Sequence, residues 1–519
     1  MTAVTRAEPG AGEPAALRVE PFDRFNQQLV ANVHPSGWAE PEPGDRYHLV
    51  VIGAGTGGLV TAAIAAGLGA RVALAERHLM GGDCLNVGCV PSKGVIGAAR
   101  AWQAAADAGR VFGGPRVVGS GDFAAVMERM RRIRAGLSRV DSAARFRDLG
   151  VDVFLGEARF VARDAARVNG KLLRFRRAVI ASGARAAAPP IPGLEQAGYL
   201  TNETIFTLTE LPDHLVVLGA GPIGCEMAQA FARLGARVTL IAQGARILPR
   251  EDADAARVVE GAMERHGVRL LRQARATRVE LRESRRVVSV EREGRTEEIA
   301  GDRILVAVGR APNVEGLGLE EAGVRYDRTG VTVNDRLRTS NPRIYAVGDI
   351  CSRHKFTHAA DAQARMVIGN ALFFGLGGGR VSRLVMPWVT YTTPEVAHVG
   401  MSEAEAVAAG HPVHTVTVPL TEVDRALLDG QEEGFLRVHL RRGSDRILGA
   451  TLVADHAGEM IGELTVAMAN GLGLSKVGAA IHSYPTQAEV FRKAADAWRR
   501  TRLTPTAKRV FATFFKLVR

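Results

Sequence analysis

The hydrophobic pattern of the chain contains the same unit twice. In the first copy, the largely apolar run His48–Ile52 precedes an Ala-rich segment of helical composition and a second run, Arg71–Ala75. In the second copy, Leu215–Leu218 precedes another helical segment and the run Val238–Ile241. Short, nearly continuous apolar runs are typical of parallel strands that helices cover on both faces. The pattern therefore predicts two βαβ units in an α/β protein.

Each unit carries three glycines directly after its first strand. They are Gly53, Gly55 and Gly58 in the first unit and Gly219, Gly221 and Gly224 in the second. Such glycines let a turn approach a pyrophosphate at a helix N-terminus, and an acid after the second strand, here Glu76, binds ribose hydroxyls. A generic tight turn produces the spacing alone, but strand, glycines, helix, strand and acid in order are more specific. Two units predict two dinucleotides, a flavin and a nicotinamide.

The second unit differs from the first at the position of the acid. Ala242 stands there, and Gln243 and Arg246 follow it. Because no carboxylate repels a 2′-phosphate and a guanidinium is near, the second site is predicted to prefer NADPH to NADH. The alternative is that Arg246 is a solvated loop residue.

Two cysteines lie five positions apart between the units, in the segment Gly81–Lys93. Cys84 and Cys89 cannot bridge comfortably across an ideal helix, so Asn86 and Gly88 are expected to distort it and let the sulfurs meet. A helix N-terminus favours the thiolate, the form that exchanges with disulfides and binds soft metals. The alternative is a pair of buried free cysteines.

With the two glycine turns on either side, the segment Cys84–Lys93 resembles the class I pyridine nucleotide–disulfide oxidoreductases. The resemblance extends from about Tyr47 to Trp498. Further motifs that agree with it are Ala181–Ala184, Ile191–Gly193, Val308–Asn313 with Gly309 at a cofactor, Ile344–Asp349 and Val389–Gly400. It implies two Rossmann-like dinucleotide-binding domains, for FAD and NAD(P)H, and a C-terminal α+β dimerisation domain.

The resemblance also implies a role for each residue of the redox centre. Cys89 would be the sulfur nearest the flavin and Cys84 the outer sulfur that meets substrate. Lys93 would lie by the flavin ring and pair with Glu226, because a buried ammonium needs a carboxylate partner. Asp349 would bind a ribitol hydroxyl of FAD.

The substrate prediction depends on the segment His482–Glu489. Disulfide-reducing relatives carry a histidine, held by the glutamate that matches Glu489, where this chain has Tyr484. A phenol is a poor proton shuttle at neutral pH, and mercuric reductases of the family also carry tyrosine there. The expected substrate is therefore Hg(II), bound transiently by Cys84 and Cys89. His482 is the competing base, two residues away.

Two differences from mercuric reductases indicate that the chain resembles a mercuric reductase-like subgroup rather than the full enzyme. The C-terminal sequence Phe514–Arg519 has no cysteine pair to deliver metal, and no cysteine precedes Cys84. The alternatives are a dihydrolipoamide dehydrogenase or other small-disulfide reductase and, from another class, a non-catalytic flavoprotein partner subunit. Cys225 and Cys351 are interpreted as structural.

Composition restricts the class of protein. The 519 residues are 46% hydrophobic and 24% charged, as in a globular protein with several domains. The net charge is +12, but only seven of the 67 basic residues are lysine, and the arginines are scattered. We therefore expect no nucleic-acid partner. Without a signal peptide or a membrane span, the expected location is the cytoplasm.

The resemblance, together with the composition of the two ends, divides the chain into five parts. They are an N-terminal arm (1–45), an FAD-binding domain (46–197 and 318–380), an NAD(P)H-binding domain (198–317), a dimerisation domain (384–500) and a basic amphipathic tail (501–519). The protein is expected to be a homodimer. Two interpretations of residues 505–519 stay open, contact with an anionic membrane and packing within the dimer, of which the second is preferred.

Overall fold

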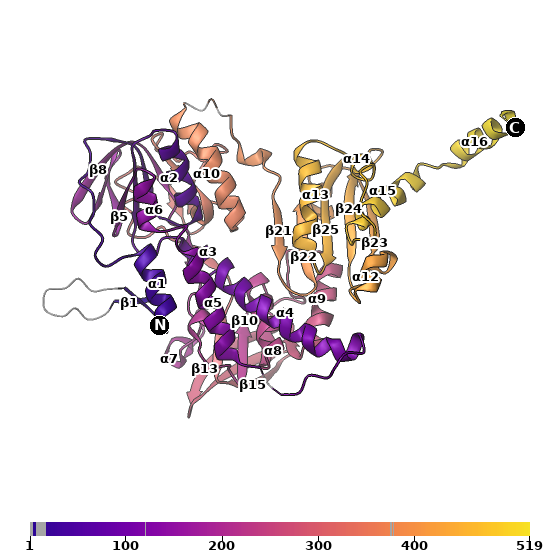
Figure 1. The fold of residues 1–519 in the computed structure, drawn as a ribbon, viewed down its shortest axis with the longest axis horizontal. Coiled ribbons are helices and arrows are strands. Elements are labelled where there is room, and N and C mark those ends of the chain that lie inside the picture. The colour runs from indigo at the N-terminus through magenta and orange to yellow at the C-terminus, as the bar shows by residue number, and fades with distance from the viewer. Residues whose placement is uncertain (1–3, 7–16, 120, 374–375, 377, 519) are drawn as a thin grey trace. The chain divides into compact units, whose positions relative to one another are not determined.

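The computed structural model describes residues 4–6, 17–119, 121–373, 376 and 378–518 (Figure 1). The chain forms two compact units. The first comprises Met1–Gly109, Pro115–Gln243 and Gln273–Arg383, and the second comprises Arg110–Gly114, Gly244–Arg272 and Leu384–Arg519. The domain boundaries expected from the sequence stay predictions.

The first unit contains a sheet built around the first predicted strand. Its strand order is β5-β4-β3-β8-β7-β6, with β20 beside β8. The bounds are β3 Tyr47–Ile52, β4 Val72–Glu76, β5 Val151–Leu155, β6 Ala158–Ala162, β7 Ala165–Val168, β8 Lys171–Ile180 and β20 Ile344–Ala346. Strand β3 pairs in parallel with β4 and β8. Its alternate residues belong to two hydrophobic cores. Leu49 and Val51 lie in one core and Val50 and Ile52 lie in the other, so the strand is apolar on both faces.

The second predicted βαβ unit forms another set of parallel strands, also within the first compact unit. Strand β10 (His214–Leu218) pairs in parallel with β11 (Arg237–Ile241) and β16 (Arg303–Val306). An antiparallel sheet of β13 (Ala274–Arg282), β14 (Arg285–Arg292) and β15 (Arg295–Gly301) lies between β11 and β16 in the sequence. Both predicted βαβ units are therefore present.

Helices connect and flank the strands of these sheets. The helices of the first unit are α1 Arg24–Val33, α2 Thr56–Gly67, α3 Gly82–Asn86, α4 Cys89–Val111, α5 Phe123–Leu137, α6 Ala143–Asp148, α7 Leu194–Ala197, α8 Pro222–Arg233 and α10 Thr357–Leu372. Its short strands are β1 Val4–Arg6, β2 Leu17–Val19, β9 Ala184–Ala186, β17 Arg310–Pro312, β18 Tyr326–Asp327 and β19 Gly330–Val331. Helices α2 and α10 pack against each other.

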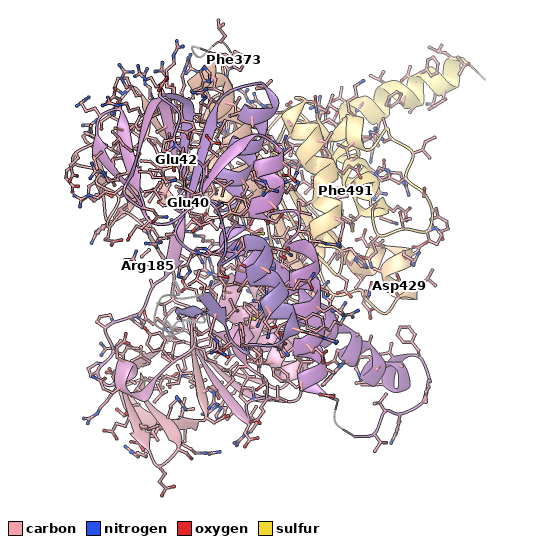
Figure 2. All side chains as sticks on the ribbon, turned by 60° about the vertical axis from the view of Figure 1, so that its left-hand side comes forward. Glu40, Glu42, Arg185, Phe373, Asp429 and Phe491 are labelled. Atoms are coloured by element: carbon pink, nitrogen blue, oxygen red, sulfur yellow. The ribbon has the colours of Figure 1, made fainter. Side chains whose placement is uncertain are left out.

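Part of the N-terminal region packs onto the first unit. Leu29 and Val33 of α1 are fully buried in the core around β3. Arg134 of α5 donates to the Asn26 side chain at 2.6 Å. Helix α1, within the arm expected over residues 1–45, is therefore held against the first unit; residues 1–3 and 7–16 lie outside the described part, and the arm as a separate segment stays a prediction. The segment Glu40–Glu42, labelled in Figure 2, is also held, because Lys171 pairs with Glu42 at 2.9 Å.

The second unit contains a five-stranded antiparallel sheet with the order β21-β22-β25-β24-β23. Its strands are β21 Pro387–Thr390, β22 Glu395–Gly400, β23 Val413–Pro419, β24 Phe435–Arg441 and β25 Ile447–Ala454, and β12 Val268–Leu271 belongs to the same unit. Its helices are α9 Ala253–Arg265, α11 Glu403–Ala408, α12 Asp424–Leu428, α13 Ala457–Ala469, α14 Leu474–Val477, α15 Glu489–Thr501 and α16 Pro505–Leu517. Phe491 on α15 fills the core against the sheet (Figure 2).

Among the described residues, no helix is both long and apolar enough to cross a membrane.

Candidate active site

The first glycine turn presents bare backbone at the start of α2. Gly53 has φ +101°, and a Cβ there would lie 2.4 Å from the Ala181 carbonyl oxygen. A Cβ on Gly58 would lie 1.8 Å from the carbonyl oxygen of Gly53. Gly82 approaches this turn so closely that its Cβ would come within 2.6 Å of the Gly55 Cα. Since Gly55 caps α2 without a side-chain hydrogen bond, free amides and the helix dipole suit the diphosphate of a dinucleotide.

Glu76 lies at the end of β4, beside this turn. Its carboxylate accepts hydrogen bonds from the Ala54 amide at 2.6 Å and from the His78 amide at 2.8 Å. The carboxylate that is predicted to bind the ribose therefore also holds the glycine turn.

The second glycine turn repeats this geometry. Gly219 has φ +109°, and a Cβ on Gly224 would lie 1.9 Å from the Gly219 carbonyl oxygen. Gly221 caps α8 without a side-chain hydrogen bond, and Pro222 opens the helix. A second diphosphate cradle is therefore formed from backbone alone, and Gly309, with φ +145°, lies just before β17.

The residues predicted to choose the nicotinamide lie after β11. Ala242 is buried and Gln243 is exposed. The Arg246 guanidinium donates to two backbone oxygens of its own loop, those of Pro249 at 3.0 Å and Glu251 at 3.4 Å. Arg246 is thus an exposed loop residue that its own backbone holds, which is compatible with both interpretations of its role.

The predicted distortion between the two cysteines is a complete break in the helix. Helix α3 ends at Asn86, and α4 begins at Cys89. A Cβ on Gly88 would lie 2.7 Å from the Asp83 carbonyl oxygen, so the break requires glycine. The Asn86 amide donates to the carbonyl oxygens of Met80 at 3.1 Å and Gly82 at 2.8 Å, which fixes the end of α3.

The two thiols are free, and they are electrostatically unlike. A hydrogen bond from the Cys84 thiol is the largest of the causes that together lower the pKa of Cys89 to about 6; the Thr357 hydroxyl at 3.3 Å and the Lys93 ammonium act in the same direction, and burial opposes them. Donating to Cys89 raises the pKa of Cys84, and burial adds to this. At neutral pH the arrangement favours a Cys89 thiolate next to a Cys84 thiol.

The predicted ion pair between Lys93 and Glu226 is confirmed. Lys93 on α4 donates to Glu226 on α8 at 2.8 Å. The Glu226 side chain is only 7% exposed and that of Lys93 is 35% exposed. The two charges act on Cys89 in opposite directions, because the ammonium lowers the pKa of this thiol and the carboxylate raises it.

Arg310 connects the redox segment with the predicted ribitol residue, and the sequence did not single it out. Its guanidinium contacts the carboxylate of Asp83, donates to the Ala184 carbonyl oxygen at 2.6 Å and lies 3.4 Å from Asp349 Oδ2. Burial raises the pKa of Asp349, and the Arg310 charge opposes this. An ionised Asp349 suits a hydroxyl donor such as ribitol. The only local signals for Arg310 and Asp83 are their positions beside Gly309 and Cys84.

Among the described residues, no hydrogen bond joins Tyr484 to Glu489. The Tyr484 hydroxyl donates to Asp424 Oδ2 at 2.9 Å, the residue is 69% exposed, and this hydrogen bond raises the pKa of the phenol. Glu489 is buried and pairs through Oε1 with Arg492, whereas its Oε2 has no hydrogen-bond partner within the described residues. The competing base, His482, uses both ring nitrogens, one on Glu463 at 2.9 Å and one on the Ala480 carbonyl oxygen at 3.1 Å.

The remaining cysteines fit the structural interpretation. Cys225 is fully buried on α8. Burial raises the pKa of Cys351 to about 12. Among the described residues, no group of three or more His, Cys, Asp or Glu side chains is arranged to hold a metal ion.

Comparison with known proteins accounts for this architecture. A model described as pyridine nucleotide-disulphide oxidoreductase matches residues 47–364, and a model of the dimerisation domain of such proteins matches residues 386–495. Mercuric reductase of Staphylococcus aureus is 32% identical over 490 residues, covering 92% of this chain and 89% of that protein. Dihydrolipoyl dehydrogenase 3 of Pseudomonas aeruginosa is 35% identical over 465 residues, covering 87% and 97%.

Solved structures agree in fold. The HOCl-induced flavoprotein disulfide reductase RclA from Escherichia coli has a TM-score of 0.76 at 30% identity, covering 87% of this chain and 99% of that one. LpdA from Mycobacterium tuberculosis has a TM-score of 0.78 at 28% identity, with the same coverage. The expected α/β fold with a C-terminal dimerisation domain is confirmed.

Proposed function

Because the chain belongs to the pyridine nucleotide-disulphide oxidoreductase family, we propose that it passes electrons from NADPH through FAD and the Cys84–Cys89 pair to Hg(II). The family uses FAD and NAD(P)H, and the dimerisation domain supports a homodimer. When bound, FAD supplies the transfer of an electron pair between the nicotinamide and the sulfur pair. The overall reaction converts NADPH and Hg(II) into NADP⁺, Hg(0) and one proton, so charge and electrons balance.

The observation that carries the proposal is the asymmetric thiol pair. The pKa of Cys89 is lowered to about 6, so this sulfur is a thiolate at neutral pH without an external base. Cys84 lies next to it and loses its proton when a soft cation replaces that proton at sulfur. Two adjacent sulfurs thereby become a ligand pair for a cation that prefers soft, low-coordinate binding.

Tyr484 supports a metal substrate over a disulfide. Thiol–disulfide exchange needs an acid that protonates the departing thiolate, and the Asp424 hydrogen bond makes the phenol a weaker acid than usual. The phenol oxygen nevertheless keeps a lone pair that can contact a cation held by the partner subunit's thiols. The S. aureus and Streptomyces lividans relatives named mercuric reductase support this reading, the latter at 34% identity.

A small-disulfide reductase is the second candidate. The dihydrolipoyl dehydrogenase relatives favour it, as does the contact of 2.9 Å between His482 and Glu463, which is a carboxylate-held imidazole. However, the other ring nitrogen of His482 is also occupied, so proton transfer through this imidazole would break a hydrogen bond.

Two substitutions at position 484 separate the candidates. We expect Tyr484→Phe to lower kcat/KM for Hg(II) on the order of tenfold, about 1.4 kcal/mol, because an oxygen beside the bound cation is lost. We expect Tyr484→His to raise the reduction of lipoamide or glutathione disulfide by on the order of 100-fold, because an imidazole there can use the unpartnered Oε2 of Glu489. Stopped-flow and steady-state NADPH oxidation measure both effects.

Tyr326→Phe is the matched control, because Tyr326 is also an exposed tyrosine whose hydroxyl donates to a carboxylate, that of Glu320. It should leave every rate unchanged. The metal proposal would be rejected in favour of the disulfide reductase if the unmodified protein reduces disulfides rapidly and Tyr484→Phe leaves the rate of Hg(II) reduction unchanged.

A further inference from the structure

The C-terminal helix α16 is encoded by strong local signals but lies largely exposed in the described part of the structure. The Thr504 side chain caps the helix by accepting from the Ala507 amide at 3.2 Å, and Pro505 occupies its first turn. None of its residues is buried. Within the described residues, no hydrogen bond or ion pair joins an α16 side chain to another element. Figure 1 shows α16 as a separate helix beyond α15 at the end of the chain.

The helix has one apolar face and one basic face. At 100° per residue, Val510, Phe511, Phe514, Leu517 and Val518 fall on one side, with Phe515 at its edge. These side chains are all at least half exposed. Lys508, Arg509 and Lys516 lie on the other side. A helix of 13 residues without a packing partner is only marginally stable in water, so this face needs an apolar surface to cover it.

The charge of the segment selects the kind of surface. From Arg499 to the end of the sequence there are seven arginine and lysine residues and no aspartate or glutamate. Pairing this helix with the same helix of a second copy would cover the apolar face but would leave the basic face without an anionic partner. Nucleic acid would neutralise the charges but would leave the phenylalanines in water. An anionic lipid surface satisfies both faces, since the aromatic side enters the acyl boundary and the basic side meets the headgroups.

We propose that α16 is an interfacial anchor that binds the protein to anionic lipid bilayers. The helix lies in the plane of the surface, because 13 residues at 1.5 Å each are too few to cross a hydrocarbon core of about 30 Å. Its attachment through the short segment Arg502–Thr504 places the rest of the enzyme beside the membrane. This proposal does not depend on the identity of the electron acceptor.

Co-sedimentation of the full-length, FAD-loaded protein with vesicles tests the proposal. We expect binding to vesicles of phosphatidylcholine with phosphatidylglycerol to be at least about tenfold stronger than binding to phosphatidylcholine alone, and to weaken as salt is raised. Phe511→Ser/Phe514→Ser should lower binding at least about tenfold through the apolar face. Lys508→Gln/Arg509→Gln/Lys516→Gln should lower it to the level of the neutral vesicles.

Val117→Ser/Val118→Ser is the matched control, because both valines are exposed (63% and 93%) and lie elsewhere in the chain. It should bind vesicles like the unmodified protein. In all variants, NADPH-dependent ferricyanide reduction should be retained, which shows that the enzyme is folded. Equal sedimentation with neutral and anionic vesicles, or none with either, overturns the proposal. It is also overturned if the phenylalanine variant changes only the oligomeric state in light scattering, which would assign the helix to a second copy, or if duplex DNA binds where anionic vesicles do not.

Discussion

The ion pair behind the redox cysteines offers a test in which its two members act in opposite directions. Lys93 lowers the pKa of Cys89, and Glu226 raises it, although the two side chains are bound to each other at 2.8 Å. We therefore expect Lys93→Met to raise the pKa of Cys89 and Glu226→Gln to lower it. A purely structural role of the pair would give both variants the same sign.

The size of the first shift follows from the loss of a cation and the exposure of the thiolate to an uncompensated carboxylate. A nearby opposite charge shifts a pKa by about 1–3, so we take an increase of about 1 for Lys93→Met. With the pKa of Cys89 at about 6, the thiolate fraction at pH 5 is about 9%, and it would fall to about 1%. Alkylation of Cys89 at pH 5 should therefore slow about tenfold, but only about twofold at pH 7.

The assay is the rate of iodoacetamide modification of Cys89 between pH 4.5 and about 9, resolved by peptide mass spectrometry. A Cys84→Ser background removes the competing thiol and keeps a hydroxyl donor, and the comparison is made within that background. Lys171→Met is the matched control, because Lys171 pairs with Glu42 at 2.9 Å far from the thiols in sequence. It should leave the profile unchanged.

The stability of the variants supplies a second readout. Lys93→Met removes the cation from the Glu226 side chain, which is only 7% exposed. We expect this to cost about 2 kcal/mol of stability, less than breaking a fully buried pair, because Lys93 itself is partly exposed. Lys93→Met/Glu226→Gln should recover most of this loss. An unchanged alkylation profile in a Lys93→Met variant that melts earlier, or a Glu226→Gln profile displaced to higher pH, would refute the electrostatic reasoning.

Two further predictions concern the nucleotide and the second unit. We expect kcat/KM for NADPH to exceed that for NADH by on the order of tenfold, because Ala242 replaces an acid, and a preference for NADH in steady-state kinetics would contradict this. Burial raises the pKa of Glu251 to about 7, although Trp388 donates to it at 2.7 Å. A carboxyl group whose pKa is raised in the folded state stabilises the fold fully below its ordinary value of 4.5 and loses this contribution as the pH rises through about 7. The unmodified protein should therefore lose up to about 3 kcal/mol of stability through Glu251 between pH 5 and about 8, and Glu251→Gln should not show this loss. Parallel pH profiles of the free energy of unfolding for the two proteins would contradict the prediction.

Features that depend on neighbouring residues could be predicted from the sequence. Strand β3 is apolar on both faces, and Gly53 and Gly58 after it have no room for a Cβ, so the local order of strand, glycines and helix was enough to locate the first cradle. The break between α3 and α4 followed from Gly88 and from the wide spacing of Cys84 and Cys89. The pair Lys93 and Glu226 was located only through the family resemblance, because 133 residues separate its members.

Features that depend on tertiary partners could not be predicted. Helix α1 lies in a polar sequence, and its fixed position rests on Arg134, which binds Asn26 from 108 residues away. Arg310 and Asp83 are 227 residues apart, and neither belongs to a pattern that marks an ion pair. Asp424 of α12 accepts the hydrogen bond of the Tyr484 hydroxyl from 60 residues away, and no local pattern connects the two residues.

The central claim is that the Cys84–Cys89 pair reduces a soft metal cation at the expense of NADPH. The most direct measurement is anaerobic NADPH oxidation with Hg(II), with release of Hg(0) as the product, by the unmodified protein and by Cys84→Ser with its FAD content verified. We predict one Hg(0) per NADPH for the unmodified protein, faster turnover than with lipoamide or glutathione disulfide, and loss of Hg(0) release in the variant. Equal Hg(0) release by Cys84→Ser, or Hg(II)-independent turnover that only a disulfide stimulates, would contradict the claim.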